Sequence, residues 1–188
     1  MIPLLNFFVW FISIIFLLTS LDKIIHWGQH IDAMERYSII RMPYIKIFLF
    51  LFTLGELYVS ITLIFNRATI SNTVIFFVLI IIYTLAVAIN LIRGNNSISC
   101  GCGSVLENDR LSVSLVYRNF MFMVVFGLLF HFRTLISANP ISLDKYFVLG
   151  LLALCIILLY GVAKEYYETI FVFNRKLMKY QMEQEEEL

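Results

Sequence analysis

The sequence predicts an all-α integral membrane protein, a bundle of about five transmembrane helices with an interfacial amphipathic helix. Of its 188 residues, 61% are apolar and only 14% are charged, and the mean hydropathy is +0.87. A soluble domain is about half apolar and about one quarter charged. This composition excludes a soluble enzyme, a disordered regulator and a small disulfide scaffold. The near balance of 14 basic and 13 acidic residues gives no reason to expect a nucleic-acid partner.

Five runs are long and apolar enough to cross a lipid bilayer, which takes about 20 residues of helix. We expect spans at residues 2–21, 45–65, 70–92, 113–134 and 146–163. The first lacks the basic start and the cleavage site of a signal peptide, so we expect it to be retained. The fourth reaches spanning length only with Arg118 in its first turns. Backbone groups in lipid must bond within their own segment, which is why helices are expected.

Three further regions complete a single helical domain, residues 1–163, and its tail. Residues 24–41 mix charged and apolar side chains at helical spacing, which predicts an amphipathic helix at the membrane interface. Residues 93–112 form a polar loop that contains two closely spaced cysteines. Residues 164–188 are expected to form a helical polar tail, which ends in an acidic run.

The cysteine pair of this loop is the most informative feature of the sequence. Cys100 and Cys102 are separated by one glycine, which tolerates the backbone angles of a small disulfide ring. Labile, accessible disulfides are typical of catalysis, so we interpret the two as candidate catalytic residues for thiol–disulfide exchange. Two alternatives remain open, a structural or incidental pair and a metal site. The metal site would be a Cys2His2 zinc site with His26 and His30, four residues apart on the interfacial helix.

Glu56 lies inside the second predicted span. An ionisable residue there is costly and is a functional candidate. It could relay protons if the protein reduces a quinone, or it could lock helix packing with Asn90, Ser60 or Thr62. Because the chain has no second close pair of cysteines, its redox pair would have to exchange with an external thiol partner, a membrane quinone, or both.

These residues, in their order and spacing, resemble the MauE branch of the DoxX-like membrane proteins over roughly residues 10–135. The cysteine loop with the downstream Arg-Asn pair is the most specific part of the resemblance. The chain departs from the family pattern at Gly103-Ser104, where the family has Phe-Gly. The matching positions are Lys23, Pro43, Gly55-Glu56-Leu57, Arg93-Gly94, Cys100-Gly101-Cys102-Gly103 and Arg118-Asn119.

The resemblance implies a four-helix core similar to the vitamin K epoxide reductase type, in a bacterial cytoplasmic (inner) membrane. It implies that Cys100 and Cys102 are the redox pair, accompanied by the motif residues Glu56, Arg118 and Asn119. MauE-like proteins are associated with the maturation of methylamine dehydrogenase, often beside a thioredoxin-like partner. We therefore expect a thiol–disulfide oxidoreductase that exchanges electrons between a client or thioredoxin-like dithiol and a membrane quinone. The alternative is a non-enzymatic membrane subunit or small-molecule carrier, with a structural or zinc-binding Cys-Gly-Cys loop.

Two observations disagree about which side of the membrane carries the cysteine loop. With five spans, eleven of the 14 Lys and Arg residues fall at the same face as the loop. An excess of positive charge marks the cytoplasmic side. Disulfide formation in exported clients, however, belongs on the oxidising outer side. Charge and chemistry thus point to opposite faces.

Overall fold

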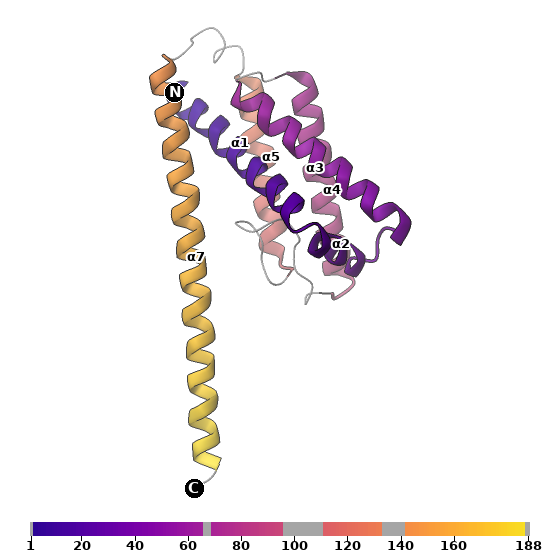
Figure 1. Ribbon diagram of the computed structural model, residues 1–188, viewed down its shortest axis with the longest axis vertical. Coiled ribbons are helices and arrows are strands. Elements are labelled where there is room, and N and C mark those ends of the chain that lie inside the picture. Colours follow the sequence, from indigo (N-terminus) through magenta and orange to yellow (C-terminus); the bar gives the residue numbers. More distant parts are fainter. Residues whose placement is uncertain (1, 66–68, 96–110, 133–141, 187–188) are drawn as a thin grey trace.

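A computed structural model describes residues 2–65, 69–95, 111–132 and 142–186, and these residues form helices without strands (Figure 1). The helices are α1 (Ile2–Ile25), α2 (Trp27–Arg36), α3 (Met42–Ile64), α4 (Ile70–Ile92), α5 (Val113–His131) and α7 (Leu143–Glu186). Five of them are long and apolar enough to cross a membrane, namely α1, α3, α4, α5 and the Leu143–Tyr167 part of α7. The predicted fold class, an α-helical membrane bundle, is confirmed.

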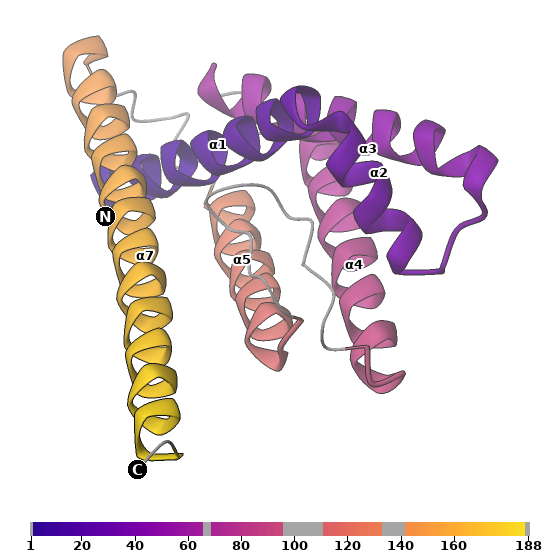
Figure 2. The same ribbon diagram turned by 60° about the horizontal axis from the view of Figure 1, so that its bottom comes forward.

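Helices α1, α3, α4 and α5 form the body of the bundle, with α2 at one end of it (Figure 1). Helix α1 packs against α3 and α7, while α4 packs against α3 and α5. The membrane-spanning helices alternate in direction along the chain, as Figures 1 and 2 both show. Helix α2, the end of α4 and the start of α5 therefore lie at the same end of the bundle.

Small residues bring the bundle helices close together. The Ser13 hydroxyl of α1 donates to the Ser60 carbonyl of α3, and the Ser60 hydroxyl donates to the Ser13 carbonyl, both at 3.0 Å. At Gly55 of α3, a side chain would meet Leu79 of α4 at 3.3 Å. Contacts of this kind are typical of helix pairs in membranes, where close packing and polar bonds replace the hydrophobic effect.

Stacked aromatic rings link three of these helices. Phe76 of α4 stacks on Phe126 of α5, with ring centroids 3.9 Å apart and an angle of 9° between the rings. Phe16 of α1 approaches the same Phe76 ring at 5.2 Å. All three rings are buried in the largest apolar core of the described residues. This core fixes how α1, α4 and α5 meet, which positions the cavity described below.

Helix α7 stands at the edge of the bundle and projects well beyond it (Figures 1 and 2). The Tyr146 hydroxyl donates to the Ile64 carbonyl at 2.9 Å, and the Trp10 ring of α1 lies against Gly150. The predicted tail, residues 164–188, continues the last span as one helix up to Glu186. The polar tail and the last span are therefore parts of a single element.

The segment between the first two spans differs from its predicted form. Helix α1 continues to Ile25, four residues beyond the end of the predicted span 2–21. The interfacial helix predicted over 24–41 is the shorter α2, which ends at Arg36 and is followed by Ser38 at a positive φ of 50°. Asp22 and Lys23, the charged residues that follow the first apolar run, are thus helical residues of α1. Both are buried in the bundle.

Helix α4 ends in a glycine-dependent cap just before residues 96–110, which contain Cys100 and Cys102 and are called the cysteine segment below. Gly94 has a φ of 77°, which favours glycine. Its amide donates to the Leu91 carbonyl at 3.1 Å, and the Asn95 amide donates to the Asn90 carbonyl at 3.0 Å. This pair of bonds is a Schellman motif, which stops the helix and turns the chain.

Candidate functional site

The described helices enclose a cavity of about 330 Å³ at the α2 end of the bundle. Apolar side chains form most of its wall, among them Phe16, Leu49, Ile80 and Phe122. Five helices also contribute polar side chains, namely Lys23 (α1), His30 (α2), Glu56 (α3), Tyr83 (α4) and the pair Arg118 and Asn119 (α5). An apolar cavity with a few convergent polar groups is the usual form of a small-molecule site.

The cavity reaches the outer surface of the bundle. Ile39, Ile82 and Leu85 line it, and all three are also exposed apolar side chains. Ile82 and Leu85 lie on α4, a helix long and apolar enough to cross the membrane. An apolar molecule dissolved in the bilayer could therefore enter from the side of the bundle.

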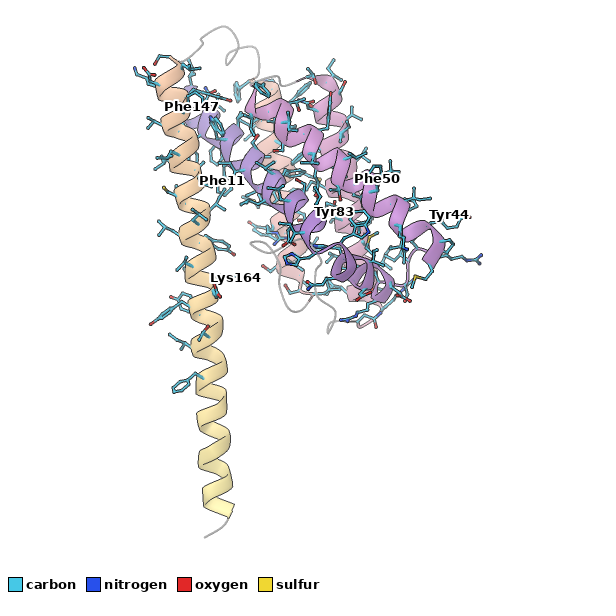
Figure 3. All side chains as sticks on the ribbon, viewed as in Figure 1. Phe11, Tyr44, Phe50, Tyr83, Phe147 and Lys164 are labelled. Atoms are coloured by element: carbon cyan, nitrogen blue, oxygen red, sulfur yellow. The ribbon has the colours of Figure 1, made fainter. Side chains whose placement is uncertain are left out.

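A buried cluster of three polar side chains occupies the wall of the cavity. Lys23 forms an ion pair with Oε1 of Glu56, and the side chains are only 4% and 2% exposed. The Tyr83 hydroxyl donates to the same oxygen at 2.6 Å, and Lys23 Nζ lies 5.1 Å from the centre of the Tyr83 ring. In Figure 3, Tyr83 lies within the bundle close to α1 and α3, whereas Phe50 and Tyr44 point away from it.

The second carboxylate oxygen of Glu56, Oε2, differs from Oε1 in its hydrogen bonding. Oε2 is buried and has no hydrogen-bond partner among the described residues. Leaving a buried acceptor unsatisfied costs about 1–3 kcal/mol, and more when the group is charged. The cluster therefore holds one buried acceptor that no described residue satisfies, on a side chain that lines the cavity.

A second cluster lies where α1 passes into α2. Asp22 is hydrogen-bonded to two histidines, one at each oxygen of its carboxyl group: His26 Nδ1 lies 3.0 Å from Oδ1, and His30 Nε2 lies 2.9 Å from Oδ2. His26 precedes α2, and His30 is inside it. Since His30 also lines the cavity, this cluster joins the cavity to the end of the bundle.

The motif residues of α5 face the same cavity. Arg118 and Asn119 both line it, and the Asn119 amide donates to the Thr84 hydroxyl of α4 at 3.2 Å. The structure thus places Glu56, Arg118 and Asn119 around one cavity, although they lie on two different helices. Lys23, whose position at the end of the first predicted span matches the family pattern, lines the same cavity.

The predicted redox pair, Cys100 and Cys102, lies outside the described residues. So does half of the alternative zinc site, and the described histidines of that alternative both engage Asp22. In the described ranges, no group of three or more His, Cys, Asp or Glu residues is arranged to hold a metal ion. The two cysteines remain a prediction from the sequence.

The predicted packing partners of Glu56 differ from those in the structure. Ser60 bonds to Ser13, Thr62 bonds to carbonyls of its own helix, and Asn90 bonds to the Ala86 carbonyl. The actual partners are Lys23 and Tyr83. A sequence signal for the first was present, because ionisable residues inside a membrane usually pair with each other. Tyr83 carried no such signal, as it is one of 10 tyrosines in an aromatic-rich chain.

The comparisons with known proteins bear on the same part of the chain. No curated protein and no solved structure matches the sequence significantly. The family model described as "Methylamine utilisation protein MauE" matches residues 1–132, which cover α1 to α5 and hence every residue of the cavity wall. With most of its length matched, the chain belongs to the MauE family of membrane proteins.

Proposed function

We propose that this protein is a membrane thiol–disulfide redox protein that supports the maturation of another protein, in methylamine utilisation or a related pathway, as the family name suggests. Cys100 and Cys102 are its redox pair, and a quinone of the bacterial cytoplasmic membrane is its electron acceptor. The thiol partner is a disulfide-containing client or a thioredoxin-like protein, with which this chain acts alone or as a subunit of a membrane complex.

The observation that carries this proposal is the Glu56 carboxylate in a cavity with mostly apolar walls. Its Oε1 is held by Lys23 and Tyr83, whereas its Oε2 has no partner in the described part of the chain. A quinol hydroxyl is a donor of the required kind, and apolar walls suit its ring and its isoprenoid tail. The cavity volume of about 330 Å³ falls at the lower end of the usual range for ligand sites.

The described flanks of the cysteine segment support the same site. Leu111, which follows the segment, packs in a small apolar cluster with Tyr37 and Val87. Tyr37 and Val87 are themselves part of the cavity wall. Before the segment, the Gly94 cap turns the chain at the same end of α4. Both described flanks of the cysteine segment therefore lie at the cavity end of the bundle.

The proposed chemistry has two balanced stages. A thiolate of the partner attacks the Cys100–Cys102 disulfide to form a mixed disulfide, and the partner's second thiol then displaces the remaining cysteine. The partner leaves as a disulfide, and the pair is left as two thiols. Those thiols then lose two electrons to the quinone and release their two protons to water as the Cys100–Cys102 disulfide re-forms. The quinone takes up two protons in the cavity and becomes a quinol.

The test uses the full-length protein in lipid nanodiscs, with dithiothreitol as the dithiol and ubiquinone-1 as the quinone. We expect quinol formation well above the uncatalysed rate, followed by absorbance. The double variant Cys100→Ser/Cys102→Ser should fall to the uncatalysed rate. Cys155→Ser is the matched control, because that cysteine is exposed on α7 and should not affect turnover. A double variant that keeps the wild-type rate would refute the redox role.

The location of the quinone is tested separately. Ala86 lines the cavity, while Ile81 is an exposed residue of the same helix and does not line it. We expect Ala86→Phe to fill the cavity and raise the KM for ubiquinone-1, and Ile81→Phe to leave it unchanged. Equal effects of the two substitutions would contradict the site. Quinone binding without any change in cysteine redox state would instead favour the small-molecule carrier, and zinc lost on replacing the cysteines would favour the metal site.

A further inference from the structure

Three side chains at the junction of α1 and α2 form a continuous hydrogen-bonded line. His26 Nδ1 meets Oδ1 of Asp22 at 3.0 Å, and Oδ2 of Asp22 meets His30 Nε2 at 2.9 Å. Their side chains are 46%, 10% and 6% exposed in that order. The line therefore runs from the surface of the protein, through a carboxylate, to a buried imidazole.

Its inner end opens onto the candidate site. His30 lines the cavity, and so do the charged and titratable groups that face it from the other helices: Lys23 of α1, Glu56 of α3, Tyr83 of α4 and Arg118 of α5. The backbone keeps the three residues in line, because the His26 amide donates to the Asp22 carbonyl at 2.8 Å and the His30 amide donates to the His26 carbonyl at 3.2 Å.

We propose that His26, Asp22 and His30 form a proton relay between the aqueous surface and the cavity. The inference rests on the proposed function, since a cavity in which a quinone becomes a quinol must receive two protons. Protonated His26 gives its Nδ1 proton to Oδ1 of Asp22. At the same time the Asp22 carboxyl group, protonated on Oδ2, passes that proton to Nε2 of His30, and His30 releases its Nδ1 proton to a base in the cavity. The relay resets when the carboxyl group and the imidazoles reorient and His26 takes up a new proton from water.

The arrangement of exposure is what favours a relay over a simple clamp between the helices. A clamp needs only the two bonds to Asp22, and either histidine could then be buried or exposed. Here one imidazole reaches solvent and the other lines a cavity that holds the buried Lys23–Glu56 pair. The relay also gives Glu56 a route for protons that does not cross the apolar wall.

The test measures proton entry into the cavity directly. Tyr83→3-nitrotyrosine introduces a group whose absorbance changes when it ionises, at a residue that lines the cavity. After a rapid pH jump in nanodiscs, we expect fast equilibration with the intact relay. Asp22→Asn and His30→Gln should slow it by about tenfold or more, as expected when a positioned proton carrier is lost. Asp32→Asn, at an exposed acid of α2, is the matched control and should leave the rate unchanged.

His26→Gln adds a variant that keeps the fold, because this side chain is nearly half exposed. It should also slow equilibration, and added imidazole should restore the rate, which a purely structural role would not allow. Equal rates in all variants, or slowing that imidazole does not relieve, would overturn the relay. The measurement needs neither thiol nor quinone. Relay-dependent equilibration in a protein without dithiol–quinone turnover would therefore refute the proposed function and still support proton entry by this route.

Discussion

Separating the buried partners Lys23 and Glu56 should strongly destabilise the protein. Lys23→Met leaves the Glu56 carboxylate in the cavity wall with only the Tyr83 hydroxyl, and Glu56→Leu leaves the Lys23 ammonium there without its carboxylate. Because the two side chains are only 4% and 2% exposed, water screens neither charge. Removing one partner of a buried pair costs about 3–5 kcal/mol.

The remaining contact with Tyr83 places the expected loss at the lower end of this range. A loss of about 3 kcal/mol corresponds to a fall of roughly 6–12 °C in the melting temperature of a chain of this length. The double variant Lys23→Met/Glu56→Leu should recover most of this stability, because apolar residues of similar size can replace a buried pair at little cost. Its free energy of unfolding should lie within about 1 kcal/mol of the wild type, not at the sum of the single losses.

The assay is reversible unfolding of the full-length protein by sodium dodecyl sulfate from mild detergent micelles, with tryptophan fluorescence as the signal. Lys46→Met is the matched control, because this lysine of α3 is exposed, and its loss should change stability by less than about 0.5 kcal/mol. Single variants that lose less than about 1 kcal/mol, or a double variant at the sum of the singles, would refute a coupled buried pair.

Two further predictions use the same unfolding assay. Gly150→Ala should destabilise by about 1–3 kcal/mol, since a Cβ there would lie 2.8 Å from the Trp10 ring, whereas Gly161→Ala on the same helix meets nothing within 4 Å and should stabilise by roughly 0.5–1 kcal/mol. Gly94→Ala should cost about 1–2 kcal/mol because of its φ of 77°, and Gly28→Ala, in open space at ordinary φ, should not destabilise. Equal changes in stability for Gly150→Ala and Gly161→Ala would contradict the packing of Trp10 on α7. Equal changes for Gly94→Ala and Gly28→Ala would contradict the glycine-dependent cap of α4.

The fold class could be predicted from the sequence because the bilayer leaves few alternatives. A run such as residues 70–92 has no charge, and in lipid such a run must satisfy its backbone as a helix. Helix ends were harder to predict when charges were near. Asp22 and Lys23 follow an apolar run and suggested that the first span ends at 21, yet α1 carries both into the bundle. Each has a partner there, which a hydropathy pattern cannot reveal.

The candidate site could be predicted only in part for a related reason. Glu56 stood out because a carboxylate is unexpected in an apolar span. Its contacts depend on the rotation and depth of each helix relative to its neighbours, which result from packing such as the Ser13–Ser60 contact and the Phe76–Phe126 stack. The rotation and depth of each helix cannot be read directly from the sequence. The cavity and the line of His26, Asp22 and His30 both depend on how the helices are rotated and placed relative to one another.

The path of the chain bears on the orientation of the bundle in the membrane. The cavity, α2 and both described flanks of the cysteine segment lie at one end of the bundle, the end with the excess of Lys and Arg. Two of those basic residues, Lys23 and Arg118, line the cavity, yet leaving them out keeps the excess at this end. The charge rule thus predicts that Cys102 resists an impermeant maleimide in intact cells and reacts after permeabilisation. Labelling in intact cells would instead place the thiol chemistry on the outer face, where client disulfides form, and would show that charge does not set the orientation of this bundle.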